Sequence, residues 1–235
     1  MNILAIDTSL ATGTVAAAEC VGDTLRIEER PLGQPGEHAK RLAPTLTEAA
    51  AALGWRPADA ELVAVVRGPG SFTGLRVGVA TAKALCWATG AKLIRISGFE
   101  LVAVRSAAAI DVGGAIAVAF DAGRGDVHAA WVVRDAASPS GWVVGESSLV
   151  PIGTWLDSLP HGSWASGPAI DSIVEAARDR GIAIPPPGSR LPSAAEAARI
   201  AVARFASGEA DDPRSLVPEY SRPSYADEKP TTPSG

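Results

Sequence analysis

The sequence predicts an α/β protein of two lobes, each a mixed β-sheet with flanking helices. Residues 1–30 hold three short strand patterns separated by turn residues, which is the arrangement of an antiparallel meander. Strand and helix patterns then alternate as far as residue 97, as they do where parallel strands join the same sheet. From residue 115 the order of strands begins again with different residues, which indicates a duplicated fold.

The first lobe is expected within residues 1–105. Its strands are predicted from apolar runs bounded by turn residues: NILAID, GTVAAAEC, TLRIEER, LVAVVR and KLIRIS (2–7, 13–20, 24–30, 62–67 and 92–97). Residues 37–54 place leucine and alanine at helical spacing before Gly54, and Pro44 is expected to kink this helix. A second helix is predicted over residues 75–90.

The second lobe is expected within residues 106–192, and a last helix and a tail within residues 193–235. The predicted strands are AIAVAFD, VHAAWVVR, GWVVGESSLV and a short one around Trp164, and the predicted helices span about residues 152–159 and 169–180. The last helix opens on Ser193 with Glu196 three residues later, which is the spacing of a capping box. We expect this helix to pack back on the first lobe and the tail to be loose at its end.

The composition excludes several classes of protein. The 235 residues carry 21 basic and 26 acidic side chains, a net charge of −5, whereas a protein that grips nucleic acid by itself usually shows a basic surplus or stripe. Strong binding of RNA by this chain alone is therefore not expected. No apolar stretch approaches the ~18 residues that a membrane span needs. No basic leader precedes the apolar start, so a cytoplasmic location is expected.

The cysteines and histidines do not form a metal-binding pattern. Cys20 and Cys86 have no paired spacing and are expected to be small core residues. His38, His128 and His161 lie far from one another in sequence, so no two imidazoles share one helical face. No metal site is expected.

Two lobes that each open on a hairpin resemble the plan of the actin-like ATPase superfamily, which has an RNase H-like fold. In that plan the hairpin turns hold phosphate, because backbone N–H groups converge on an anion and an aspartate orients hydrated magnesium. The corresponding positions are Asp7 and Ser9 in the first lobe and Asp121 and Gly123 in the second. Ser9 stands where working kinases of the superfamily usually carry glycine, so the first turn looks degraded. Arg124 can contact phosphate or pair with a carboxylate, and any ATP binding is expected to be weak.

A motif at residues 67–78, RGPGSFTGLRVG, joins a buried strand to the second helix. Ser71 or Thr73 can cap that helix, and its N-terminus behind the glycine-rich turn can also bind an anion with help from Arg76. Three small residues fall four positions apart on one helical face: Gly74, Gly78 and Ala82. Such a face lets another backbone approach closely, either that of the chain itself or that of a partner.

Together with LAIDTS, DAGRGDVH and VPEYSR (residues 217–222), the RGPGSFTGLRVG motif resembles the TsaB (YeaZ) family of the tRNA threonylcarbamoyladenosine pathway. The resemblance covers both lobes and the tail. It implies a non-catalytic subunit that binds a larger catalytic sister, TsaD, and supports transfer of threonylcarbamoyl to N6 of adenosine 37 in tRNAs reading codons that begin with adenine. It also implies a P-loop ATPase, TsaE, as a partner, contact with tRNA only through the complex, and no cofactor required by this chain.

The resemblance and the helical spacing together give a candidate partner interface on the two first-lobe helices. Its expected residues are His38, Arg41, Leu42, Gly74, Arg76, Gly78 and Ala82. The same surface makes a homodimer plausible when the sister is absent. Two other functions stay open: an ATP-dependent small-molecule kinase of the actin-like superfamily, and a metallopeptidase of the glycoprotease type, for which the scattered histidines supply too few ligands.

Overall fold

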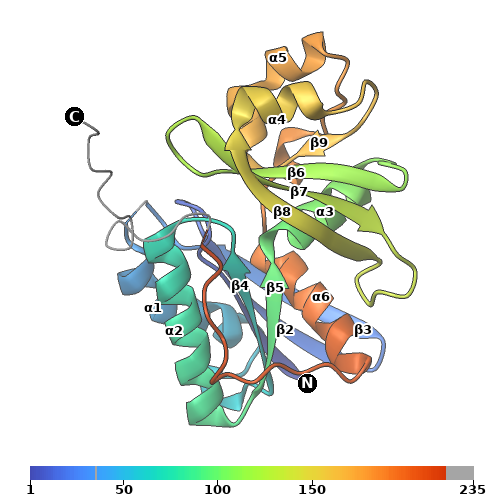
Figure 1. The fold of residues 1–235 in the computed structure, drawn as a ribbon. Coiled ribbons are helices and arrows are strands. Elements are labelled where there is room, and N and C mark those ends of the chain that lie inside the picture. Colours follow the sequence, from blue (N-terminus) through green and yellow to red (C-terminus); the bar gives the residue numbers. More distant parts are fainter. Residues whose placement is uncertain (35, 221–235) are drawn as a thin grey trace, which may run out of the picture.

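The computed structural model describes residues 1–34 and 36–220 and contains two lobes, each built on one sheet (Figure 1). The first sheet has five strands in the order β3-β2-β1-β4-β5, and the second has four in the order β8-β7-β6-β9. Each sheet begins with a hairpin, which confirms the predicted actin-like plan.

The first sheet combines an antiparallel meander with two parallel strands. The meander consists of β1 (Asn2–Asp7), β2 (Thr14–Val21) and β3 (Thr24–Pro31), and the parallel strands are β4 (Leu62–Gly68) and β5 (Lys92–Ser97). All five lie within one or two residues of the predicted ranges. The apolar runs of β1 and β4 arise because helices cover both faces of these central strands.

Alternate side chains of β1 enter two different cores. Leu4 and Ile6 pack under the helices α1 (His38–Ala52) and α2 (Phe72–Thr89). Ile3 and Ala5 point to the opposite face, where α6 (Ala194–Ala206) packs. The last helix therefore returns to the first sheet after the chain has passed through the second lobe (Figure 1).

The second sheet is covered by different helices on its two faces. Its strands are β6 (Ala115–Asp121), β7 (Asp126–Arg134), β8 (Trp142–Pro151) and β9 (Ala165–Ser166). One face carries α4 (Ile152–Ser158), the 3₁₀ turn η2 (Pro168–Ser172) and α5 (Val174–Asp179). The single helix predicted over residues 169–180 is wrong, because Ile173, with φ −134° and ψ 19°, leaves the helical conformation and separates η2 from α5. Two further 3₁₀ turns are η1 (Pro57–Asp59) and η3 (Pro187–Ser189).

Helix α3 (Gly98–Ala109) joins the two lobes and was not predicted. Phe99 packs in the second-lobe core, whereas Leu101 packs in the core between the first sheet and α6. Because both sides of this helix are covered, its sequence lacks the polar face that marks a surface helix.

The ends of two helices show which of the predicted signals are used. Helix α2 begins after Ser71, whose Oγ accepts a hydrogen bond from the Gly74 amide at 3.3 Å, as predicted. The capping box predicted for α6 is wrong: Ser193 Oγ donates to Glu29 of β3 at 2.7 Å, and the same carboxylate accepts from the Ala195 amide at 3.0 Å. A strand of the first sheet therefore caps this helix from outside.

The remaining expectations concern α1 and the membrane. Helix α1 continues through Pro44 as one helix, and Gly54 follows its end in the left-handed region with φ +87°. Within the described part of the chain, no helix is both long and apolar enough to cross a bilayer.

Candidate functional site

The small-residue face of α2 lies against the first hairpin turn. A Cβ added at Gly74 would overlap the carbonyl oxygen of Thr8, and one added at Gly78 would overlap the hydroxyl oxygen of Thr8. Ala82 is fully buried in the core beneath α2. The small-residue face was expected to pack either against the chain itself or against a partner. It packs against the chain itself. Gly74, Gly78 and Ala82 are therefore wrongly placed in the expected partner interface, because the end of β1 and its turn already cover them.

Asp7 and Ser9 build that turn and are engaged with each other. Asp7 is 2% exposed, and its Oδ1 accepts hydrogen bonds from the Ser9 amide at 2.9 Å and the Ser9 hydroxyl at 2.6 Å. The Ser9 carbonyl accepts from the Ser71 amide at the start of α2 at 2.7 Å. Burial raises the pKa of Asp7, and the two hydrogen bonds from Ser9 offset part of that rise. Asp7 thus holds the turn closed instead of presenting a carboxylate to solvent.

Asp7→Asn is expected to stabilise the protein at neutral pH. Because the folded pKa of Asp7 lies above its ordinary value of 3.8, the folded state binds this proton more tightly than the unfolded state does. The contribution to stability is present below pH 3.8 and is lost as the pH rises through the folded pKa. The variant should therefore gain free energy of unfolding at pH 7 but not near pH 3, as measured by urea denaturation.

The matched control is Asp121→Asn, because Asp121 is an exposed turn aspartate that accepts an amide hydrogen bond from Gly123 at 2.7 Å. Because this side chain is exposed, the Asp121→Asn change should leave the free energy of unfolding at pH 7 nearly unchanged. An equal gain in both variants, or a gain for Asp7→Asn that is the same at pH 3 and pH 7, would contradict burial of the Asp7 charge.

The second hairpin turn is exposed and built differently from the first. Gly123, Arg124 and Gly125 follow one another in the left-handed region with φ values of 73°, 60° and 82°. The turn closes through the Asp126 amide, which donates to the Gly123 carbonyl at 3.1 Å. Asp121 and Gly123 are therefore joined within their own turn, as Asp7 and Ser9 are in theirs.

Helix α1 supplies less exposed surface than expected. His38 is 7% exposed and its Nε2 lies 3.0 Å from the Ala11 carbonyl, so it fixes α1 to the first hairpin loop. Leu42 is 2% exposed and belongs to the core under α1 and α2. The expectation that these two residues meet a partner is wrong because the chain covers them, whereas Arg41 is half-buried at the surface.

Arg76 is the one exposed residue among those expected on α2 to meet a partner. It lies beside residues that were not predicted to belong to the site. Its guanidinium carbon lies 3.9 Å from the centroid of the Phe72 ring, and its Nε donates to the Tyr220 hydroxyl at 2.9 Å. Trp87, further along the same helix, is 68% exposed. Phe72 lies inside the RGPGSFTGLRVG motif and Tyr220 inside VPEYSR. Both motifs were identified in the sequence, but neither indicated that the two segments contact each other.

Tyr220 ends a segment that we call the C-terminal strap (residues 211–220), which crosses from α6 to the side of α2 (Figure 1). Asp211 pairs with Arg95 at 2.9 Å, and Leu216 is buried in the core under α2. The last two residues of VPEYSR and the predicted loose end of the tail, within residues 221–235, lie outside the described residues.

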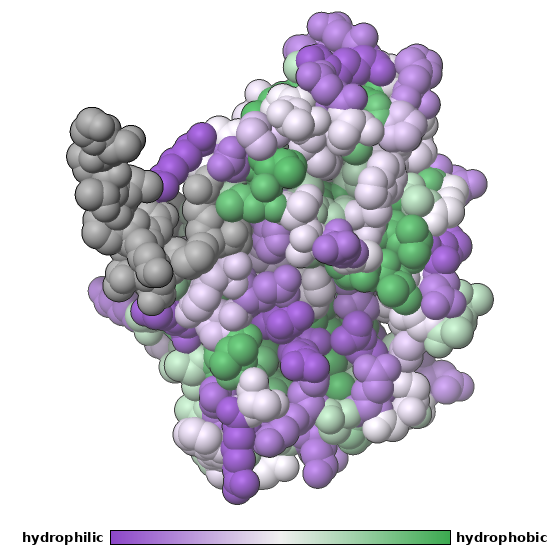
Figure 2. Space-filling model, viewed as in Figure 1, coloured by the Kyte–Doolittle hydropathy of each residue, from purple (hydrophilic) through white to green (hydrophobic). Residues whose placement is uncertain are grey.

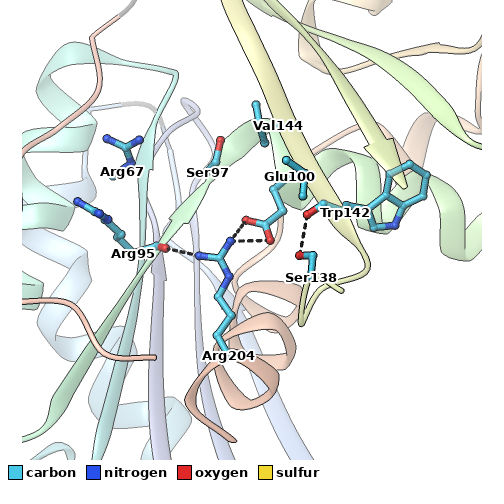
Figure 3. A pocket seen from close by; sticks show the side chains of 9 residues that line it. Arg67, Arg95, Ser97, Glu100, Ser138, Trp142, Val144 and Arg204 are labelled. Atoms are coloured by element: carbon cyan, nitrogen blue, oxygen red, sulfur yellow. Dashed lines mark hydrogen bonds and ion pairs between the residues drawn. The ribbon is translucent and has the colours of Figure 1, made fainter. Parts of the chain in front are cut away.

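A cleft of about 260 Å³ lies between the lobes, where the ends of β4 and β5 face β8 (Figure 3). Glu100 is 1% exposed in its wall and accepts hydrogen bonds from Arg204 at 2.8 and 2.7 Å. Arg67 and Arg95, which also line the cleft, pair with strap carboxylates. Each of the three arginines is thus matched by a carboxylate, and the cleft has no excess charge to attract an anion.

Residues that could hold a metal are scattered. His128 Nε2 lies 3.0 Å from the Ser147 hydroxyl, and burial lowers the pKa of this histidine. Burial raises the pKa of the Cys86 thiol to about 11, which disfavours the thiolate that binds metals. Among residues 1–34 and 36–220, no three His, Cys, Asp or Glu side chains come together in a group that could hold a metal ion.

Comparison with known proteins decides the family. A family model described as "TsaD: tRNA N6-adenosine threonylcarbamoyltransferase" matches residues 34–189. The TsaB protein of Escherichia coli is 28% identical over 229 residues, which cover 96% of this chain and 94% of that protein. The chain belongs to the TsaB/YeaZ family. The prediction from the four motifs is confirmed.

Other members agree with this assignment. TsaB of Bacillus subtilis is 34% identical over 128 residues, which span 54% of this chain and 53% of that protein, about half of each. The solved structure of YeaZ from Pseudomonas aeruginosa matches with a TM-score of 0.74 over 93% of this chain and 99% of that one, at 21% identity. This structural likeness confirms the fold.

Proposed function

We propose that this TsaB/YeaZ family chain is a non-catalytic subunit of the machinery that makes threonylcarbamoyladenosine in tRNA. The observation that carries the proposal is the likeness to E. coli TsaB, a "tRNA threonylcarbamoyladenosine biosynthesis protein", over nearly the full length of both chains. The subunit binds a TsaD-type catalytic sister and supports transfer of threonylcarbamoyl to N6 of adenosine 37. A TsaE-type ATPase joins the same complex.

The arrangement of the two hairpin turns supports a role without catalysis. Asp7 is buried and bonded to Ser9, and the start of α2 occupies the space beside it. A kinase of the actin-like superfamily needs that aspartate to orient hydrated magnesium. A metallopeptidase needs about three protein ligands on one metal, which the described histidines do not bring together. Neither alternative has a specific observation in its favour.

The outer side of α2 is the part of the expected α2 interface that stays exposed. It presents Phe72, Arg76 and Trp87, with the C-terminal strap alongside. This side replaces the buried glycine face as the proposed contact with the sister. In the absence of the sister the same side serves self-association, and tRNA is reached only through the complex because the net charge of −5 disfavours direct binding.

The proposal predicts that cells without this chain lose threonylcarbamoyladenosine from their tRNA. Nucleoside analysis of bulk tRNA should show the modified base absent on depletion and restored by the full chain. The purified chain should co-elute with the TsaD-type sister in size-exclusion chromatography. Unchanged modified base after depletion would overturn the proposal, as would stoichiometric zinc with peptidase activity in the isolated chain.

A further inference from the structure

An arginine on the outer side of α2 is held in place by two aromatic rings. Arg76 lies over the Phe72 ring, with its guanidinium carbon 3.9 Å from the centroid, and 5.7 Å from the centroid of the Tyr220 ring. The two rings are 4.6 Å apart at 36°. Tyr220 adds a hydrogen bond of 2.9 Å from Arg76 Nε to its hydroxyl, across 144 positions of sequence. We call these three residues the aromatic–arginine cluster.

In the described part of the chain, the guanidinium of this cluster has no carboxylate opposite it. Within residues 1–34 and 36–220, Arg76 forms no ion pair, and its hydrogen bond to Tyr220 uses Nε alone. As far as the described residues go, its two terminal amino groups are left for a ligand. A guanidinium already fixed by a ring face and a phenol loses less freedom on binding than a free one, and its planar edge matches a carboxylate with two parallel hydrogen bonds.

The C-terminal strap fixes the position of Tyr220. The Glu219 amide donates to the Arg67 carbonyl at 2.7 Å, and the Glu219 carboxylate pairs with the Arg67 guanidinium at 3.0 Å. The strap backbone passes so close to Gly68 that a Cβ there would overlap the Glu219 carbonyl. Lys83 of α2 donates to the Leu216 carbonyl at 3.2 Å. Tyr220 is thus placed by contacts with β4 and α2 that do not involve Arg76.

The surroundings of the cluster fit a protein surface better than a small molecule. Phe72 is 37% exposed, Val217 of the strap is 62% exposed, and Trp87 lies further along α2. On the side of the molecule that Figure 2 shows, apolar side chains form separate groups among polar ones. A contact on such a face needs a charged anchor in addition to apolar burial, and arginine and tyrosine are enriched among residues that dominate binding energy.

We propose that the aromatic–arginine cluster docks a carboxylate side chain of the TsaD-type sister, and that Tyr220 is the positioning residue for Arg76. The inference rests on the proposed function, because it names one contact of the complex described there. The charge on Arg76, which no described residue pairs, selects an acidic residue of the partner, and the flanking apolar side chains exclude water from the contact.

Isothermal titration of the full chain with the purified sister tests this at low and high salt. Arg76→Ala should weaken binding by about tenfold or more and reduce its salt dependence. Tyr220→Phe removes only the hydroxyl and should weaken binding by a smaller factor while leaving the thermal midpoint of the free chain unchanged. Arg76→Lys should not restore affinity, because an ammonium cannot form the paired hydrogen bonds. The control is Arg178→Ala on α5, an exposed arginine paired with Glu175, which should bind like the wild type.

The outcomes separate the two proposals. If the wild-type chain binds the sister and Arg76→Ala and Tyr220→Phe bind equally well, the cluster is not the anchor and the inference is overturned while the proposed function stands. If the wild-type chain does not bind the sister, the proposed function fails and the inference fails with it. If Arg76→Ala changes only the self-association of this chain, the occupant is a second copy and the inference is also overturned.

Discussion

Arg204→Met is expected to lower the free energy of unfolding by about 3–5 kcal/mol, because it leaves a buried carboxylate without its partner. Glu100 is 2% exposed in its side chain and lies 2.7 Å from Arg204, whose own side chain is 22% exposed. Arg204 also donates to the Arg95 carbonyl at 3.2 Å, so one side chain of α6 joins the start of α3 to the end of β5 (Figure 3). Urea denaturation at pH 7 measures the loss.

A second variant shows whether the loss comes from the stranded charge. Glu100→Leu combined with Arg204→Met removes both charges and should recover much of the stability, since apolar replacement of a buried ion pair is often neutral. Arg178→Met, which breaks an exposed pair, should cost less than about 1 kcal/mol. A loss for Arg204→Met no greater than that of Arg178→Met would show that the buried pair does not stabilise the junction of the lobes.

Gly78→Leu should lower the thermal midpoint because the new side chain has no space against Thr8. Overpacking of this kind costs about 1–3 kcal/mol, and a protein of this size loses roughly 2–4 °C for each kcal/mol. Ala80→Leu is the matched control, since Ala80 is an exposed position of the same helix. Differential scanning calorimetry should show a clear decrease for the first variant and little change for the second.

The Gly78→Leu variant also checks which side of α2 meets a partner. A Gly78→Leu protein with an unchanged midpoint that no longer binds the sister would return the glycine face to the interface. That result would contradict the close approach of α2 to the first hairpin turn.

The strands were predicted well because their signal is local. NILAID and LVAVVR are apolar throughout because β1 and β4 are covered on both faces, and turn residues mark where they end. Helix α3 was missed for the opposite reason, because packing against both lobes removes the polar face that helical periodicity requires.

The candidate site was predicted only in part because it depends on contacts between distant residues. The spacing of Gly74 and Gly78 indicated that another segment packs closely against α2. It could not show that this segment contains Thr8, which lies about seventy residues earlier in the chain. His38 lies at the start of α1 as predicted, yet its burial depends on the loop around Ala11. Tyr220 and Arg76 meet only because the strap crosses the molecule, and neither motif contains that information.

We propose that this chain supports a transferase by docking and contributes no catalytic group of its own. Threonylcarbamoyl transfer to tRNA, reconstituted from the purified sister, the TsaE-type ATPase and a threonylcarbamoyl-adenylate synthase, tests it most directly. We expect no transfer without this chain, full transfer with it, and full transfer with Asp7→Asn, because Asp7 holds a turn closed and orients no magnesium. Loss of transfer with a folded, sister-bound Asp7→Asn chain would show instead that the Asp7 carboxylate takes part in the reaction.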